Sequence, residues 1–274
     1  MYRIGLSSCA FALTEENFKE LRDSGIEAIE LSMELDQHLQ INHKEVLELS
    51  KRYDVDLWSY HLPFAPFEMI DISSLDKDIR ENSIKLYTEL IEKAAHIGID
   101  KFVVHPSGEP IQADIREERI KYSMQTLDIL AELASRCGAV IAVEDLPRTC
   151  LGNTSDEIRR LIGVNEKLRV CFDTNHLLSE SNIHFMEALS DKIVTVHVSD
   201  YDFIDEKHWL PGEGQIDWRA MLSTFQKINY QGVWMYELRL NFPRALTRSR
   251  ELTFEDFRKN ANAIFDGKLP EIIQ

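Results

Sequence analysis

The chain is predicted to fold as a single (β/α)8 TIM barrel that spans residues 1–274. Eight apolar, strand-like runs alternate with helical patterns, and this alternation is typical of a parallel sheet. Eight strands close a barrel of this kind, and the length of 274 residues is near the roughly 250 of one barrel domain. In addition, six of the runs end on a histidine or a carboxylate, and barrel enzymes place their active sites at the carboxyl ends of the strands.

The predicted strands are short runs rich in β-branched and aromatic residues, which suit a pleated sheet. In chain order they are Arg3–Ser7, Ala28–Ser32, Val55–His61, Lys101–His105, Val140–Glu144, Arg169–Asp173, Ile193–His197 and Val233–Glu237. The six chemically active tips are His61, His105, Glu144, Asp173, His197 and Glu237. Because the tips of parallel strands converge, these side chains are expected to share one site.

Helical patterns separate the strands. The clearest covers Asp76–Ile97, where apolar residues recur near the 3.6-residue period, and a second covers Ile115–Ser135. Gly98 and Gly138 follow these two helices at positions that favour a left-handed C-terminal cap. The last helix is predicted over Arg248–Phe265. Further capping side chains occur in Thr14–Asn17 and Asn153–Asp156.

An open, doubly wound sheet is the alternative fold, because periodicity alone does not count closure. Such sheets usually carry a glycine-rich phosphate loop after the first strand. The sequence SCAFALTEEN after Ser7 contains no glycine. The barrel is therefore the favoured interpretation.

The composition predicts a soluble, cytoplasmic protein. Lys and Arg total 31 against 47 Asp and Glu, so the formal net charge is −16, and no basic face for nucleic acid is expected. The N-terminus reads as a first strand rather than a signal peptide, and no run is long enough to span a bilayer. The four cysteines lack zinc or disulfide spacing.

Glu144, Asp173, His197 and Glu237 form the central candidate site. Three carboxylates and one imidazole suit a single divalent ion such as Mn²⁺, Mg²⁺, Co²⁺ or Zn²⁺. Burying three carboxylates together without a cation would be unfavourable. The alternative interpretation is that each is an isolated strand-end residue with local hydrogen bonds.

Other residues near the predicted tips could bind substrate or a second metal. His61 and His105 each precede a proline within two residues, which favours a rigid extended exit from the strand. His176 follows Asp173 by a short turn, and His208 lies in a Pro- and Gly-containing loop of a kind that often carries function. Arg239 is two residues beyond Glu237 and could bind a hydroxyl or a carboxylate.

Seven motifs then give the chain a resemblance to a known family. They are YHLPF (60–64), VVHPS (103–107), VEDLP (143–147), FDTNH (172–176), VHVSD (196–200), LPGEGQIDW (210–218) and YELR (236–239). Over nearly the whole chain, the sequence resembles the xylose-isomerase-like TIM-barrel superfamily, in its sugar phosphate isomerase/epimerase branch. The resemblance implies that one divalent metal is coordinated by Glu144, Asp173, His197 and Glu237.

In the ketose 3-epimerases of this branch, the carboxylates that match Glu144 and Glu237 also move protons on opposite faces of the substrate. His176 matches a substrate-binding histidine. The chain departs from those epimerases after the His197 motif, where their arginine is missing and the sequence continues to Phe203.

The chain also resembles the endonuclease IV branch, which uses three zinc ions. The matching residues are His61, His105, Glu144, Asp173, His176, His197, His208 and Glu237, and Glu206 stands opposite the remaining aspartate. This second resemblance implies that additional Zn²⁺ could bind. The charge of −16 and the lack of basic loops argue against a nuclease.

The function predicted from the sequence is a metal-dependent isomerase or epimerase of a small carbohydrate. Glu144 and Glu237 would exchange protons while the metal stabilises an enediolate. A multinuclear zinc phosphoesterase and an inosose-type dehydratase remain the alternatives. We expect a small, non-phosphorylated sugar as substrate and no nucleic-acid or membrane partner. The oligomeric state stays open, although these relatives are often homo-oligomers.

Overall fold

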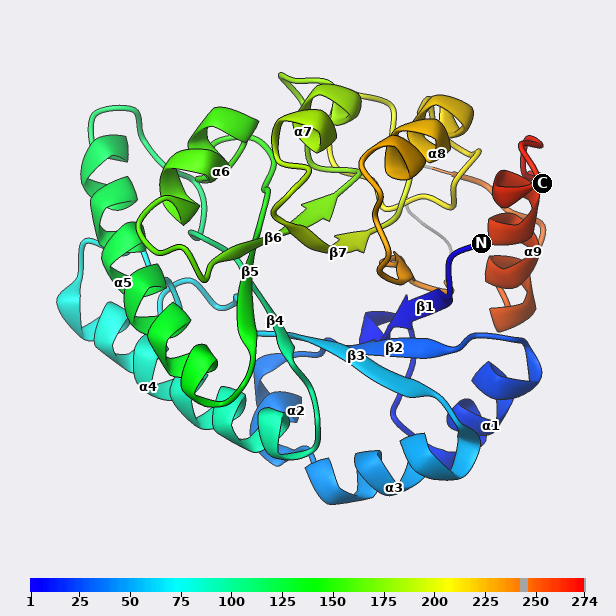
Figure 1. Cartoon of the computed structure of the whole chain (residues 1–274), viewed down its shortest axis with the longest axis horizontal. Coiled ribbons are helices and arrows are strands. Elements are labelled where there is room, and N and C mark those ends of the chain that lie inside the picture. The colour runs from blue at the N-terminus through cyan, green and yellow to red at the C-terminus, as the bar shows by residue number, and fades with distance from the viewer. Residues whose placement is uncertain (242–245, 274) are drawn as a thin grey trace.

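A computed structural model describes residues 1–241 and 246–273. Its eight strands are all parallel and follow the order β7-β6-β5-β4-β3-β2-β1-β8. The two ends of this sheet meet where the backbone N–H of Val198 donates to the carbonyl of Met235 at 2.8 Å. The helices lie outside the resulting ring of strands, as Figure 1 shows. The predicted TIM barrel is therefore confirmed.

The strands lie within one residue of their predicted bounds at each end. They are β1 Ile4–Ser7, β2 Ala28–Leu31, β3 Asp56–His61, β4 Lys101–Val104, β5 Val140–Glu144, β6 Arg169–Asp173, β7 Ile193–His197 and β8 Trp234–Tyr236. Three predicted strand ends are corrected, because β2 ends at Leu31, β4 at Val104 and β8 at Tyr236. His105 and Glu237 therefore follow their strands immediately instead of ending them.

The helices connect the strands on the outside of the barrel. They are the 3-10 helix η1 Ser8–Ala10 and the α-helices α1 Glu15–Asp23, α2 Leu35–Gln40, α3 His43–Tyr53, α4 Lys77–His96, α5 Arg116–Arg136, α6 Ser155–Ile162, α7 Asn182–Ala188, α8 Trp218–Lys227 and α9 Phe254–Phe265. The predicted caps are present, since Thr14 and Thr154 each accept a backbone N–H of the first turn. Within the described ranges, no helix is long and apolar enough to cross a membrane.

The last helix begins six residues later than predicted, at Phe254 instead of Arg248. Arg248 is instead buried beside Glu213, with its Nη2 2.6 Å from a carboxylate oxygen. The helix starts where Thr253 and Asp256 form a capping box, in which the Thr253 N–H donates to Asp256 Oδ2 at 2.7 Å. The capping box stops the helix from extending toward the N-terminus.

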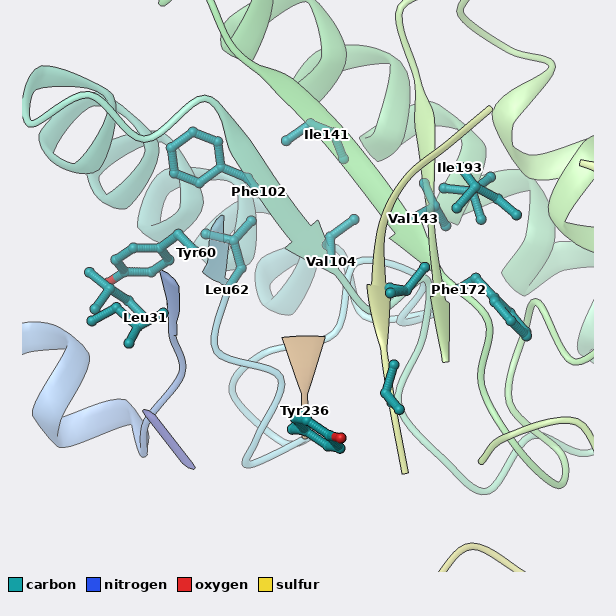
Figure 2. Packing of buried hydrophobic residues seen from close by; sticks show 14 of the residues in the cluster. Leu31, Tyr60, Leu62, Phe102, Val104, Ile141, Val143, Phe172, Ile193 and Tyr236 are labelled. Carbon is teal, nitrogen blue, oxygen red and sulfur yellow. The ribbon is translucent and has the colours of Figure 1, made fainter. Parts of the chain in front are cut away.

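The hydrophobic core has two parts, because side chains alternate across each strand. The larger part lies between strands and helices, and Figure 2 shows Tyr60 and Phe102 of adjacent strands within it, with ring centroids 6.0 Å apart. The smaller part forms two separate clusters, Ala28, Val233 and Met235 with Trp58, and Val103, Ala142 and Cys171 with Val194. We assign these separate clusters to the barrel interior.

The alternation identifies the side chains that point inward at the carboxyl end of the barrel. They lie two residues beyond interior positions such as Ala28, Val103, Ala142, Cys171 and Met235. Each strand thus places one polar residue at the carboxyl end of the barrel. These residues are Ser7, Glu30, His61, His105, Glu144, Asp173, His197 and Glu237. All eight strand ends therefore contribute to one polar layer, where the sequence had suggested six.

Candidate metal centre

The four central residues are brought together at the carboxyl ends of β5, β6, β7 and β8. One ligand atom from each of Glu144, Asp173, His197 and Glu237 lies within 4.8 Å of the others. From Nδ1 of His197 the distances are 2.7 Å to Glu144 Oε1, 3.3 Å to Glu237 Oε2 and 3.9 Å to Asp173 Oδ2. The four groups can therefore reach one cation.

Asp173 carries an oxygen that suits a cation in particular. Its Oδ1 accepts the backbone N–H of Asn175 at 2.6 Å, while Oδ2 is buried and has no hydrogen-bond partner among the described residues. Asp145 holds the end of β6 in place, because its Oδ1 accepts the backbone N–H of Asp173 at 2.8 Å. A buried acceptor without a donor is unfavourable. A divalent ion beside Oδ2 would satisfy it.

The pKa values of the two glutamates in this cluster are shifted in opposite directions. Burial would raise the pKa of Glu144, but the charge of His197 and hydrogen bonds from three histidines hold it well below the usual value. The pKa of Glu237 is raised, first by burial and further by the charge of Glu144. Burial would lower the pKa of His197, yet the surrounding anionic groups hold it well above its usual value. The site thus attracts positive charge, as a cation-binding site must.

Glu30 belongs to this site and was not identified from the sequence. It is fully buried on β2, its Oε1 lies 3.0 Å from Nε2 of His197, and its Oε2 accepts the hydroxyl of Ser59 at 2.8 Å. His197 therefore presents Nδ1 to the cluster and Nε2 to Glu30. A carboxylate on the far nitrogen is the common partner of a metal-binding histidine.

A second group lies on the side of β3 and β4. Nε2 of His61 and Nε2 of His105 each lie 3.1 Å from Oε2 of Glu144. The Nδ1–H of His61 donates to the carbonyl of Leu62 at 2.9 Å, which leaves Nε2 free to face Glu144. These three residues form another set that could hold a metal ion. Glu144 is shared between this set and the central one.

A third set consists of His176, Glu206 and His208. Nδ1 of His176 donates to the carbonyl of Asp145 at 2.7 Å, and Nδ1 of His208 donates to the carbonyl of Glu237 at 3.0 Å. A carbonyl only accepts hydrogen bonds, so Nδ1 carries a proton in each ring and Nε2 is the nitrogen that faces Glu206. Nε2 of His208 lies 2.9 Å from Glu206 Oε1, and Nε2 of His176 lies 3.9 Å from the same atom.

The loop that carries His208 is organised by Asp200. This buried carboxylate accepts the backbone N–H groups of Tyr201, Gly212 and Ile216 and the indole N–H of Trp218, at 2.8 to 3.1 Å. The Pro- and Gly-containing motif after β7 therefore folds around a single acceptor. His208 itself has a positive φ of 50°, a conformation that the packed loop holds in place.

Arg148 is a further residue that the sequence did not single out. It follows β5 with a positive φ of 53° and contacts carboxylates of two other loops. Its Nη2 lies 2.6 Å from Glu109 and 3.0 Å from Glu206, and its Nη1 lies 2.9 Å from Asp205. Arg148 thus orients Glu206 toward His176 and His208, the other two residues of the third set. Its partners lie 39 to 58 positions away, so no local pattern could reveal them.

Two cavities meet at these residues. A smaller one is lined by His61, His105, Glu144, His176, Glu206, His208 and Glu237, and it contains residues of all three sets. A larger one, of about 890 Å³, shares Glu206, His208 and Glu237 with it. Arg239 is exposed and lines the larger cavity but not the smaller one.

Comparison with known proteins agrees with this architecture. The sequence model of the family described as "Xylose isomerase-like TIM barrel" matches residues 18–253. An uncharacterised protein of Methanocaldococcus jannaschii is 28% identical over 84% of this chain and 82% of its own. "Probable endonuclease 4" of Thermoplasma acidophilum is 28% identical over 61% and 62% of the two chains.

Proteins named as sugar epimerases are also similar to this chain. "3-dehydro-D-guloside 4-epimerase" of Escherichia coli is 26% identical over 62% of this chain and 68% of its own. The crystal structure of a D-tagatose 3-epimerase-like protein superimposes with a TM-score of 0.81 at 24% identity, covering 97% of this chain and 96% of the other. At that identity, the structural similarity supports the fold alone.

Proposed function

The chain belongs to the xylose isomerase-like TIM barrel family, and from this premise we propose that it is a divalent-metal-dependent isomerase or epimerase of a small carbohydrate. The observation that carries the proposal is the convergence of Glu144, Asp173, His197 and Glu237 within 4.8 Å at the carboxyl end of the barrel. The similarity to proteins named as sugar epimerases supports the reaction class. A small-molecule substrate also suits a site whose residues line a cavity.

In this proposal the four residues hold one divalent ion. The three carboxylates supply oxygen ligands and His197 supplies Nδ1, while Glu30 keeps the proton of that ring on Nε2. When bound, the ion would polarise a substrate carbonyl and so stabilise the enediolate that forms when the neighbouring carbon loses a proton. The buried, unpartnered Oδ2 of Asp173 supports the fit of this donor set to a cation.

We assign proton transfer to Glu237 and Glu144. Glu237 lines both cavities and its side chain is 14% exposed, so it can reach the carbon of a bound sugar. Glu144 is buried, and His61 and His105 at 3.1 Å can exchange a proton with it. Isomerisation needs a proton acceptor on one face of the substrate, whereas epimerisation uses both glutamates on opposite faces.

Proton exchange tests this proposal directly. Protein saturated with Mn²⁺ is incubated with a panel of ketoses, aldoses and keto-polyols in D₂O, and the Mn²⁺ is removed before NMR follows the loss of substrate C–H signals. We expect exchange with at least one sugar, and Glu237→Gln should slow it by at least about 100-fold. Glu251→Gln, an exposed glutamate beyond β8, is the matched control and should exchange at the wild-type rate. Full metal occupancy without exchange on any sugar would refute the proposal.

The second and third sets of possible metal ligands favour a second candidate function, a zinc phosphoesterase with three ions. His61, His105 and Glu144 form one additional set, and His176, Glu206 and His208 form the other. In His61, His176 and His208 a backbone carbonyl accepts the Nδ1–H, so Nε2 is the nitrogen that a cation could bind. The similarity to a protein named as an endonuclease supports this candidate, whereas the formal charge of −16 favours a small substrate over nucleic acid.

Metal content distinguishes the two candidates. The protein is dialysed against Zn²⁺ or Mn²⁺ and analysed for metal per chain, and hydrolysis of bis(p-nitrophenyl) phosphate is measured in parallel. About one equivalent without hydrolysis supports the isomerase or epimerase. About three equivalents with hydrolysis supports the phosphoesterase, and Glu206→Gln should then lower the content to about two.

A further inference from the structure

The larger cavity extends the site well beyond the cluster of ligands. Its volume of about 890 Å³ is near the upper end of the roughly 300–1,000 Å³ of ligand pockets. Glu206, His208 and Glu237 line it at the end nearest the candidate metal centre. A monosaccharide held at that end would occupy only part of the space. The remaining walls therefore indicate what else a substrate carries.

One wall of this cavity is apolar, and we name it the apolar wall. It comes from the segments that follow the first three strands and consists of Ala10, Phe11, Met33, Leu35, Pro63 and Phe64. Phe64 is 41% exposed, and Phe11, Met33 and Leu35 are only partly buried. Single exposed apolar residues are ordinary, but a concave group beside a reactive site indicates a binding surface.

Phe64 connects the apolar wall to the candidate metal centre. Its ring stacks on that of His105, with centroids 4.3 Å apart and an interplanar angle of 21°. Phe64 also lines both cavities. A ligand that reaches the cluster through the larger cavity therefore passes along this ring. The apolar wall is continuous with the reactive site and does not form a separate groove.

The polar residues on the same side of the cavity are already engaged with one another. Ser8 Oγ donates to the carbonyl of Ser32 at 2.8 Å and accepts the Ser32 N–H at 2.8 Å. Glu34 and Gln37 bind each other in the capping box of α2. These groups need no ligand to satisfy their hydrogen bonds. This side therefore offers a ligand mainly apolar contact.

We propose that the substrate is a glycoside with an aromatic or alkyl aglycone, and that the apolar wall binds this aglycone. The glycosidic carbon is an acetal, so the carbonyl that reacts is a ketone elsewhere on the sugar. The sugar portion lies at the cluster of Glu144, Asp173, His197 and Glu237, so this part rests on the proposed isomerase or epimerase function. Phe64 contacts the junction between the two parts. The apolar wall determines specificity and takes no part in proton transfer.

Paired glycosides test this inference without requiring turnover. Binding of methyl and phenyl β-glycosides of glucose, galactose, mannose and xylose is measured by isothermal titration calorimetry in excess Mg²⁺. We expect at least one phenyl glycoside to bind about tenfold more tightly than its methyl partner, a difference of about 1.4 kcal/mol. Phe64→Ala and, independently, Leu35→Ala should each reduce this ratio to less than about threefold. Met69→Ala is the matched control, because Met69 follows the same strand, is 57% exposed and lies outside the cavity lining.

The ¹³C-labelled methyl group of Met33 locates the contact. Its NMR signal, assigned with Met33→Leu, should shift with the phenyl glycoside and remain unchanged with the methyl glycoside. Equal binding within every pair, binding of none of the glycosides, or a phenyl preference unaffected by both wall variants would overturn the inference. If the protein prefers phenyl glycosides but exchanges no substrate C–H, the apolar wall binds the substituent and the proposed reaction is refuted. If it exchanges substrate C–H but shows no phenyl preference, the proposed reaction is supported and the role of the apolar wall is refuted.

Discussion

Oε2 of Glu30 lies 3.1 Å from Nε2 of His197 and accepts its hydrogen bond, although the two residues are 167 positions apart in the chain. Both side chains are completely buried. Burial alone would raise the pKa of Glu30, but the charge of His197 lowers it on balance. Nε2 therefore donates to the carboxylate of Glu30, and Nδ1, which lies 2.7 Å from Glu144, is the nitrogen that would bind a cation in place of its proton.

Replacement of Glu30 should weaken metal binding without removing a ligand. We expect Glu30→Gln to lower Mn²⁺ affinity by about 10- to 100-fold, because the ring loses the carboxylate that orients it and increases its basicity. Calorimetric titration of the metal-free protein measures the change, and ¹⁵N shifts of His197 report its tautomer. Glu27→Gln, an exposed glutamate just before the same strand, should bind as the wild type does. Unchanged affinity in Glu30→Gln would show that Glu30 does not support the ligand.

Asp173→Asn should separate metal binding from folding. The asparagine keeps an acceptor for the Asn175 N–H but removes one negative charge from a buried group of carboxylates. We therefore expect metal-free Asp173→Asn to melt at or above the temperature of the metal-free wild type. Mn²⁺ should raise the melting temperature of the wild type by mass action and leave the variant unchanged. Differential scanning calorimetry with and without Mn²⁺ measures both, and an equal metal-induced shift in the two proteins would contradict the ligand assignment.

The alternation of side chains along each strand explains why so much of the fold could be predicted. Each strand places alternate residues in the barrel interior, so a polar tip such as Glu144 lies two residues beyond an interior residue such as Ala142. The local run was sufficient to locate the strand and its tip. Glu30 has the same relationship to Ala28, but a lone glutamate in AIEL gives no motif, and only the register across β2 and β3 brings it to His197.

Long-range contacts account for what the sequence left out. Arg148 acts on Glu206 through a loop 58 positions away. Arg248 was placed in the last helix because its neighbours allow helix, whereas in the structure Glu213, 35 positions earlier, binds it outside the helix. Pairings of this kind depend on the closed barrel and not on local periodicity.

The buried pair of Arg248 and Glu213 should contribute strongly to stability. Their side chains are 1% and 3% exposed, with two hydrogen bonds of 2.7 and 2.6 Å. We expect Arg248→Met to lower the free energy of unfolding by about 3–5 kcal/mol, because it leaves a buried, unpaired carboxylate. Urea denaturation measures the loss. Addition of Glu213→Gln should restore part of it, since the uncompensated charge is then removed.

An exposed pair provides the comparison. Nη2 of Arg22 lies 3.0 Å from Oδ2 of Asp54, and the two side chains are 49% and 83% exposed. Arg22→Met should therefore lower the free energy of unfolding by less than about 1 kcal/mol. A loss in Arg248→Met as small as that in Arg22→Met would show that Glu213 protonates or reaches water when its partner is removed.

Asp256 should make the stability of α9 depend on pH. Burial would raise its pKa, but hydrogen bonds from Arg250 and Thr253 lower it to about 2. A folded-state pKa below the unfolded value of about 3.9 means that ionised Asp256 stabilises the native state above that value. This contribution is lost as the pH falls through the folded-state value. Asp256→Asn should therefore lower the free energy of unfolding at pH 7 by about 1–2 kcal/mol, a range reduced because Arg250 is half exposed.

The difference between Asp256→Asn and the wild type should narrow to about half at pH 3, because the wild-type carboxylate then begins to lose its advantage. Urea unfolding at pH 7, 5 and 3 measures it. Asp191→Asn, an exposed aspartate between α7 and β7, is the control and should differ little from the wild type at any of these values. A deficit in Asp256→Asn that stays constant from pH 7 to pH 3 would mean that the cap acts through its hydrogen-bond geometry and not through its charge.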